Sequence, residues 1–264
     1  MPNNLIIHNK QAAGFPGIGK PAYGEAVYDT TFDCHAVGVG GNTGCKVVAD
    51  VSSQFPDKTH VPQNRSVDVA WLKAAATTYH ISPDINNYVI SQVPIITVDI
   101  PNRNLQAFPF DEVVFFDPIL GRQIYKTFIG KPVHYNHKNE DPTAAKGVIF
   151  DSYLLKIPKY NLYKIVLLTG VDKTKDQDIA SRLIENKKGG PRVGWSFGSL
   201  VNNFVCSVCG TVVNEKKTYC ACFAKGKGSI LDGKLVYELC YSSNFIEVSV
   251  VDTPADATAW GDAL

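Results

Sequence analysis

The sequence has almost no charge imbalance and no long apolar run. Its 264 residues include 26 Lys and Arg against 25 Asp and Glu, a formal net charge of +1. Long-range attraction to nucleic acid or to an anionic membrane needs a clear positive excess, so neither is an expected partner. No apolar run approaches the roughly 18 residues of a spanning helix, and the start, MPNNLIIHNKQAAGF, lacks the pattern of a secretory signal. These absences predict a protein that acts inside a cell.

Cysteine is sparse outside one short segment. The chain has seven cysteines, an odd number that does not suit a complete disulfide framework, and four of them fall in residues 206–222. This clustering favours a metal site in a reducing compartment. Cys34, Cys45 and Cys240 are interpreted as ordinary small apolar residues.

Two regions of the sequence differ in amino-acid composition. Residues 1–84 contain turn-forming clusters such as GFPGIGKPAYG and GVGGNTG, which predict a loop-rich N-terminal arm. The arm should contain one helix, in SVDVAWLKAAATTYHISP, with Ser66 as its N-cap and Pro83 just beyond its end.

Residues 85–264 are dominated by strand signals. NYVISQVPIITVDIP should form an edge or interrupted strand because of its prolines, and KPVHYNH, KGVIFDSYLLKI, LYKIVLLTGV, KLVYELCY and NFIEVSVVD are further candidate strands. One helix is expected in DQDIASRLIENKKGGP, with Ile179, Leu183 and Ile184 on its apolar face. The predicted fold class is α+β, a β-rich, antiparallel, barrel-like domain.

A lone serine lies in the glycine-rich stretch GGPRVGWSFGSLV, which should follow the helix and enter a strand. A serine hydroxyl becomes a nucleophile only beside a base, and His134 and His137 are the histidines expected in the same domain as Ser196. If KPVHYNH is extended, these two side chains project to opposite faces and only one can face the serine. On these residues alone, a structural role for Ser196 remains the stronger interpretation.

Three sequence blocks, taken together, favour a catalytic role for Ser196. GKPVHYNHKNEDPTAAKGVIFDS, GWSFGSLV and NFIEVSVVDTPADATA, in that order, resemble the prohead proteases of tailed bacteriophages, which share their fold with the herpesvirus assemblins. The resemblance covers about residues 85–264. It implies a serine endopeptidase that cleaves scaffold and capsid precursors during phage head maturation. The implied partners are capsid, scaffold or other virion proteins, in a homo-oligomer or a multi-subunit assembly. The implied location is the virion, or the host cytoplasm during assembly.

The resemblance also implies a role for each site residue. Ser196 matches the nucleophile, His137 the general base, and Glu247 the acidic residue that orients the imidazole. Alternation along the third block would place Phe245, Glu247 and Ser249 on one side of a strand. Because the assemblins use a second histidine as the third group, His134 or Asp151 could orient the base instead. Glycines of residues 189–198 are candidates for the turn that supplies oxyanion donors.

A second candidate site consists of Cys206, Cys209, Cys220 and Cys222. The pattern C-x-x-C, a ten-residue excursion and C-x-C can bring four thiolates to one tetrahedral zinc, and Gly210 permits the tight turn after the first pair. Four protein ligands leave no open position, so this zinc would stabilise a knuckle over residues 204–224 without catalysing a reaction. A redox C-x-x-C and unpaired buried cysteines are the alternatives.

Less specific interpretations stay open for these residues. Lysines in and beside the knuckle form either a solvated face or a docking site for an acidic virion partner: Lys216, Lys217, Lys225 and Lys227. Glu247 could be a solvated strand residue and His137 a core histidine. The alternative function is a catalytically silent virion structural protein that uses the same fold for assembly contacts.

Overall fold

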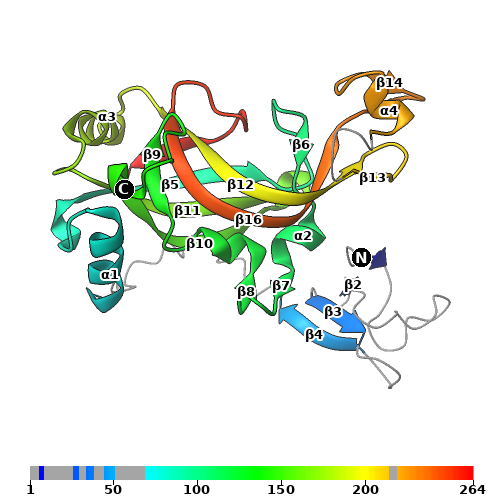
Figure 1. Cartoon of the computed structure of the whole chain (residues 1–264), viewed down its shortest axis with the longest axis horizontal. Coiled ribbons are helices and arrows are strands. Elements are labelled where there is room, and N and C mark those ends of the chain that lie inside the picture. The colour runs from blue at the N-terminus through cyan, green and yellow to red at the C-terminus, as the bar shows by residue number, and fades with distance from the viewer. Residues whose placement is uncertain are drawn as a thin grey trace.

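A nearly closed barrel of seven strands forms the centre of the described chain (Figure 1). The computed structural model describes residues 6–8, 26–29, 34–38, 45–50, 69–213 and 219–263, with side chains for 71–213 and 219–261. The strands follow one another in the order β12–β17–β5–β11–β10–β9–β16, and β16 pairs again with β12. Their bounds are β5 Tyr88–Thr97, β9 Pro132–Tyr135, β10 Gly147–Ile157, β11 Leu162–Asp172, β12 Val193–Cys206, β16 Glu238–Val251 and β17 Trp260–Ala263.

Short elements surround the barrel. The helices are α1 Val69–Tyr79, α2 Phe110–Val114, α3 Gln177–Lys187 and α4 Ala221–Ala224, with single 3-10 turns at Ile85–Asn87, Ile124–Phe128, Pro142–Ala144 and Pro158–Tyr160. The minor strands are β6 Gln106–Ala107, β7 Phe116–Asp117, β8 Arg122–Gln123, β13 Val212–Val213, β14 Ile230–Leu231 and β15 Lys234–Leu235. No helix in the described ranges is both long enough and apolar enough to cross a lipid bilayer.

The β-rich, barrel-like α+β fold predicted from the sequence is confirmed. Most neighbouring strands are antiparallel as expected, but β16 runs parallel to both β9 and β6. KLVYELCY and NFIEVSVVD do not form two separate strands. Residues 238–251 of these segments form the single strand β16, which pairs with β12 over most of its length.

Strand β5 is not at an edge, contrary to the expectation from its prolines. It pairs with β11 on one side and with β17 on the other. The chain accommodates Pro94 at an irregularity in the β5–β11 ladder, where the register shifts between Ile165 and Val166. The expectation of an edge strand is therefore wrong, and β5 is one continuous strand with a shifted register at Pro94.

Helix α3 forms where the sequence predicted it. The Asp176 side chain accepts a hydrogen bond from the backbone N–H of Ile179 (3.0 Å), which caps the first turn. Ile179 and Leu183 are buried, but Ile184 is 38% exposed and is not part of the packed face. The helix therefore rests on a narrower apolar stripe than the sequence indicated.

Helix α1 packs against the barrel through a small apolar cluster. Leu72, Ala75 and Ala76 contact Tyr88 of β5 and Val148 of β10 in this cluster. The boundary predicted between residues 84 and 85 therefore falls within a packed unit. Ser66, the expected N-cap, lies outside the described residues.

The arm predicted as irregular contains four short strands. They are β1 Ile6–His8, β2 Ala26–Asp29, β3 Cys34–Gly38 and β4 Cys45–Asp50, and they form a sheet in that order. The sequence shows mainly turn signals around these residues, because strands of three to six residues leave a weak periodic pattern.

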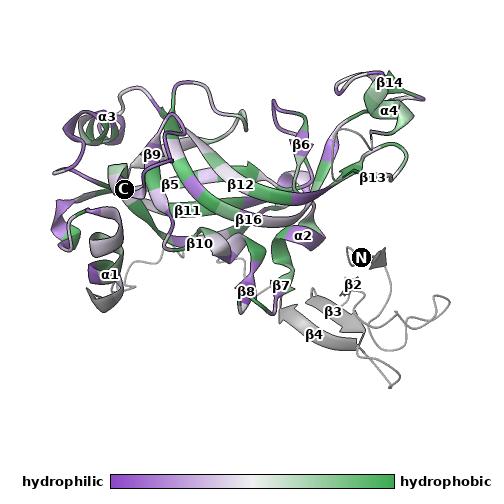
Figure 2. Ribbon diagram, in the orientation of Figure 1, coloured by the Kyte–Doolittle hydropathy of each residue, from purple (hydrophilic) through white to green (hydrophobic). Residues whose placement is uncertain are grey.

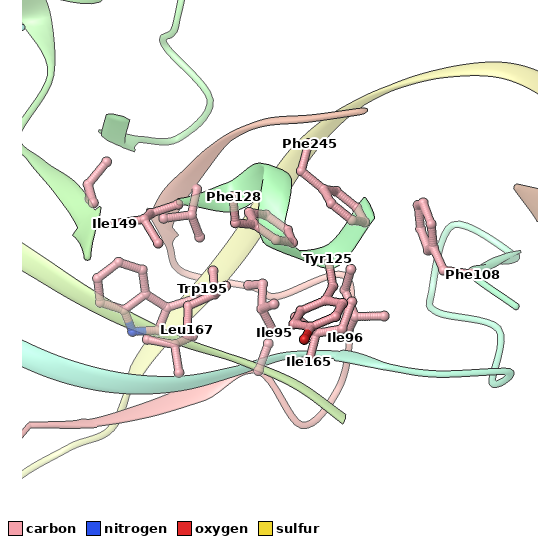
Figure 3. Packing of buried hydrophobic residues seen from close by; sticks show 14 of the residues in the cluster. Ile95, Ile96, Phe108, Tyr125, Phe128, Ile149, Ile165, Leu167, Trp195 and Phe245 are labelled. Atoms are coloured by element: carbon pink, nitrogen blue, oxygen red, sulfur yellow. The ribbon is translucent and has the colours of Figure 1, made fainter. Parts of the chain in front are cut away.

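Large aromatic and branched side chains fill the barrel (Figure 3). Phe128 and Phe245 stack with their ring centroids 4.1 Å apart, and Trp195 is fully buried. In the first part of β12 the apolar residues Val193, Trp195 and Phe197 alternate with Gly and Ser. Figure 2 shows hydrophobic and hydrophilic patches along both β12 and β16. One face of this strand pair therefore belongs to the core, and the other face is available for polar side chains.

Candidate active site and candidate metal centre

Ser196 lies on the face of β12 that points away from the core. Its neighbours Trp195 and Phe197 pack into the apolar cluster, so the two-residue period turns Ser196 and Gly198 to the opposite face. In the ladder with β16, Ser196 pairs with Ser249 and Gly198 pairs with Glu247. Directly paired residues share a face, so Ser196, Ser249 and Glu247 lie side by side.

An irregularity in β16 separates Glu247 from Phe245. Gly198 pairs with Glu247, but the next residue, Ser199, pairs with Phe245, so the register shifts by one residue at this point. One extra residue in the strand reverses the alternation. Phe245 consequently packs in the core, and the expectation that it shares a side with Glu247 and Ser249 is wrong.

His137 reaches the same face from the end of β9. The strand ends at Tyr135, and Asn136 and His137 then adopt left-handed backbone conformations, with φ of 49° and 56°. The Asn136 N–H donates to Val250 O (3.0 Å), and the His137 N–H donates to Ser249 Oγ (3.1 Å). The expectation of opposite faces for the two histidines assumed an extended chain through residue 137, and it fails because this turn redirects the backbone.

The His137 ring is bound by a buried carboxylate. Nδ1 of His137 lies 2.7 Å from Oε1 of Glu247, whose side chain is only 1% exposed. The other carboxylate oxygen, Oε2, accepts a hydrogen bond from Ser249 Oγ (2.7 Å). A carboxylate at Nδ1 favours the tautomer with its proton on Nδ1, which leaves Nε2 as the free basic nitrogen.

Gly198 provides the space that this carboxylate occupies. A Cβ atom at position 198 would lie 2.6 Å from Glu247 Oε1 and 3.0 Å from Glu247 Cγ. Real Cβ atoms do not approach other heavy atoms so closely, so any larger residue would displace the Glu247 side chain.

The carboxylate also changes the protonation of His137. Its hydrogen bond to Glu247 raises the pKa of His137 above the ordinary 6.5, and partial burial opposes this only in part. The imidazole itself stays 43% exposed. A basic ring nitrogen is therefore held at the surface by a buried acid, which is the arrangement of a general base and its orienting group.

Ser196 lies beside this pair without bonding to it. Its residue is 7% exposed, and within the described part of the chain no hydrogen bond joins Ser196 Oγ to His137. It is adjacent to Ser249, the residue that accepts the His137 N–H. The structure thus brings Ser196, His137 and Glu247 to one face, with the His137–Glu247 contact formed.

Neither alternative orienting residue contacts the His137 ring. Asp151 lies 3.6 Å from Lys126 Nζ and accepts the N–H of Ser152. His134 pairs with Ser249 across the β9–β16 ladder and is 1% exposed, and burial lowers its pKa. Its Nδ1 has no hydrogen-bond partner among the described atoms.

Two of the glycines proposed as oxyanion donors use their N–H groups to close a helix. The N–H groups of Gly189 and Gly190 donate to Asn186 O and Glu185 O, both at 2.9 Å, and these bonds close the end of α3. Gly194 and Gly198 lie within β12 and have no left-handed conformation. Their role is close approach: a Cβ at position 194 would lie 2.6 Å from Val251 O.

The four cysteines of the second site meet beside the end of β12 that is remote from Ser196. Figure 1 shows α4 in this part of the molecule. The Sγ atoms of Cys206, Cys209, Cys220 and Cys222 all lie within 4.8 Å of one another. Cys206 ends β12, Cys220 precedes α4 and Cys222 lies within it. All four are free thiols, so the cluster can hold a metal ion.

The turn after Cys206 has the predicted geometry. The Gly210 N–H donates to Cys206 O (2.9 Å), and Gly210 has a φ of 71°, which favours glycine. Phe223, Val213 and Val236 pack beside Cys206 in a separate apolar cluster. Lys227 forms an ion pair with buried Glu238 (3.1 Å), whereas Lys216 and Lys217 lie outside the described residues.

Two contributors to the first site were not identified from the sequence. Ser249 was expected only to share a face with Glu247, and Gly198 was considered only as a turn residue. The two patterns E-x-S (Glu247 and Ser249) and S-x-G (Ser196 and Gly198) could have indicated their roles. Once the register is known, each residue of one pattern pairs with a residue of the other, and paired residues share a face.

No protein-family model, curated protein or solved structure matches the chain in sequence or fold comparisons.

Proposed function

We propose that this chain is a serine endopeptidase of the prohead-protease type, which cleaves scaffold and capsid precursors during phage head assembly. The observation that carries this proposal is the buried Glu247 carboxylate on His137 Nδ1, beside Ser196 on the adjacent strand. A buried acid that orients an exposed imidazole next to a serine is the constellation that activates a hydroxyl for acyl transfer. The protein acts in the host cytoplasm and within the assembling virion, on a multi-subunit protein partner.

In the proposed reaction, each residue moves or holds a proton at a defined atom. Nε2 of His137 removes the proton from Ser196 Oγ as the hydroxyl attacks the peptide carbonyl, and then donates it to the leaving amine. Glu247 stabilises the imidazolium and keeps the proton on Nδ1. The Ser196–His137 contact forms when substrate binds, since such bonds are often loose in free enzymes.

The decisive experiment is Ser196→Ala in a co-expression assay with scaffold and capsid precursors. Precursor processing should fall to background, while the variant keeps the thermal unfolding midpoint of the wild type. Ser199→Ala, three residues along the same strand and half-buried, is the matched control and should process normally. Unchanged processing by Ser196→Ala would exclude Ser196 as the nucleophile.

A catalytically silent virion structural protein is the second candidate. It is favoured by one observation, the lack of a hydrogen bond between Ser196 Oγ and His137 within the described residues. In that case His137 and Glu247 would only fasten β9 to β16. No cleavage of any precursor by the wild-type protein, together with its presence in mature particles, would support this role.

We also propose that the four-cysteine cluster binds one structural Zn²⁺. Four thiolates at mutual distances within 4.8 Å suit tetrahedral zinc, and they leave no position for a reacting water. The metal would stabilise the segment between β12 and β16, and it would take no part in the chemistry at Ser196.

A further inference from the structure

We infer that Ser249 is a positioning residue of the proposed protease: its buried hydroxyl fixes both the Glu247 carboxylate and the His137 backbone, and so aims the imidazole at Ser196. This inference rests on the proposed function for its catalytic consequence. Its geometric part concerns only the His137–Glu247 pair and can be tested without any cleavage assay.

The Ser249 hydroxyl has one proton, and its neighbours determine where that proton points. Oγ lies 2.7 Å from Glu247 Oε2, an acceptor, and 3.1 Å from the His137 N–H, a donor. The hydroxyl therefore donates to the carboxylate and accepts from the backbone. Because it is 0% exposed, water cannot replace either bond without a rearrangement.

The same bonds exclude Ser249 as an alternative nucleophile. Its proton is engaged by Glu247, one of its two lone pairs accepts the His137 N–H, and its side chain is fully buried, out of reach of a substrate. Ser196 has no such bonds in the described structure, and it is the partly accessible member of the pair. The two serines, although opposite each other in the ladder, therefore have different roles.

Ser249 restrains the carboxylate from the side opposite His137. Oε1 of Glu247 is held by His137 Nδ1 and Oε2 by Ser249, and the side chain occupies space that a Cβ atom at position 198 would take. Because each oxygen has its own partner, a rotation of the carboxylate about its last bond would lengthen both hydrogen bonds. A residue that removes this rotation narrows the range of orientations open to the imidazole.

Ser249 also holds the unusual turn that presents His137. Two successive non-glycine residues in the left-handed region, Asn136 and His137, cost free energy that other contacts must offset. The turn is tied to β16 by the Asn136 N–H to Val250 O and the His137 N–H to Ser249 Oγ. Without the hydroxyl, the second tie is lost, so the backbone of His137 is held less firmly while its ring keeps the bond to Glu247.

The test compares Ser249→Ala and Ser249→Cys with the wild-type protein. In a peptide-cleavage assay, kcat should fall about tenfold in Ser249→Ala, as for the loss of one charge-assisted hydrogen bond, with KM nearly unchanged. Cysteine is similar in size to serine but is a weak donor, so the kcat of Ser249→Cys should lie between those of the wild type and Ser249→Ala. Ser91→Ala is the matched control, because Ser91 is equally buried and its hydroxyl has no partner among the described atoms.

The second readout is the titration of His137 followed by NMR, which needs no activity. In Ser249→Ala the midpoint should move down by about 0.5 unit, because a mobile carboxylate stabilises the imidazolium less well. A purely structural role would lower thermal stability and leave this midpoint and the pH dependence of kcat unchanged.

The two proposals fail in different ways. If the wild type shows no cleavage dependent on Ser196, the protease proposal fails, and a lowered His137 midpoint in Ser249→Ala still supports the positioning of the pair. If the wild type cleaves and Ser249→Ala matches it in kcat, pH profile and His137 titration, the positioning role is refuted and the protease proposal stands.

Discussion

Glu247 is the residue with the strongest constraints in the candidate active site. It is 1% exposed and bonded through both oxygens, and the neighbouring Gly198 has no side chain to compete for its space. Buried carboxylates are rare unless paired, because removing the charge from water costs much free energy. Its position beside an exposed histidine therefore argues against a solvated strand residue.

Replacement of this carboxylate should change the protonation of His137 and the cleavage rate together. In Glu247→Gln the amide cannot stabilise the imidazolium, so the pKa of His137 should fall toward 6.5, as measured by NMR. The rate should drop by at least about 100-fold, because the tautomer is no longer fixed. Glu140→Gln, an exposed residue near the same turn, is the control and should change neither quantity.

The raised pKa of His137 also sets the direction of pH effects. Because the folded-state pKa lies above the unfolded value of 6.5, the ion pair stabilises the fold fully below 6.5, and this contribution is lost as pH rises through the folded pKa. The base must be neutral, so cleavage should increase over the same rise. The wild-type rate should therefore increase with pH above 6.5, whereas a rate that falls throughout that range would contradict this role of His137.

At the scale of elements, the ends of strands and helices decide where polar groups lie. Strand β9 stops at Tyr135, and the left-handed turn that follows returns His137 to β16. Helix α3 begins at a capping aspartate and ends at Gly189 and Gly190, so β12 enters the barrel with Ser196 as its fourth residue.

The cap of α3 gives a stability prediction for one element. Asp176→Ala removes the acceptor for the Ile179 N–H and a 3.4 Å contact with Lys146 Nζ. The loss should be about 1 kcal/mol, or roughly 2–4 °C in Tm, measured by thermal unfolding. Asp178→Ala, an exposed acid in the same first turn that is not the cap, should shift Tm less. Equal shifts for both variants would mean that general charge near the helix start, and not the cap, is responsible.

At the scale of the whole molecule, one strand pair joins the two candidate sites. β12 and β16 run side by side from Ser196 and Glu247 at one end to Cys206 and Glu238 at the other (Figure 1). The cysteine cluster thus lies at the end of the same ladder that carries the candidate catalytic face. Lys227, which follows α4, also forms an ion pair with Glu238 at the start of β16.

Removal of metal should destabilise the chain without altering the chemistry of the candidate active site. Elemental analysis should find one zinc per folded chain, and a chelator should lower Tm, because metal bound only to the folded state stabilises it. Cys209→Ser should lower the zinc content, while Cys240→Ala, a core cysteine outside the cluster, should retain it. Less than one metal per folded wild-type chain would contradict the proposed zinc site.

The local features could be predicted from the sequence because they depend on short-range chemistry. Helix α3 follows from its cap and glycines, the strands from their branched residues, and the cysteine cluster from ligand spacing across one excursion. The joining of two segments into the single strand β16, and the place of β5 between two strands, depend on distant partners and were not predicted.

By itself, the sequence determined which residues can carry chemistry: a serine between glycines, a histidine, an acid and four thiols. Only the tertiary structure decided their arrangement. The β12–β16 register, one bulge before Glu247 and one left-handed turn at His137 together place these side chains on a common face. Side chains alternate with a period of two along a strand, so a shift of one residue reverses the face, and that shift is set by packing across the barrel.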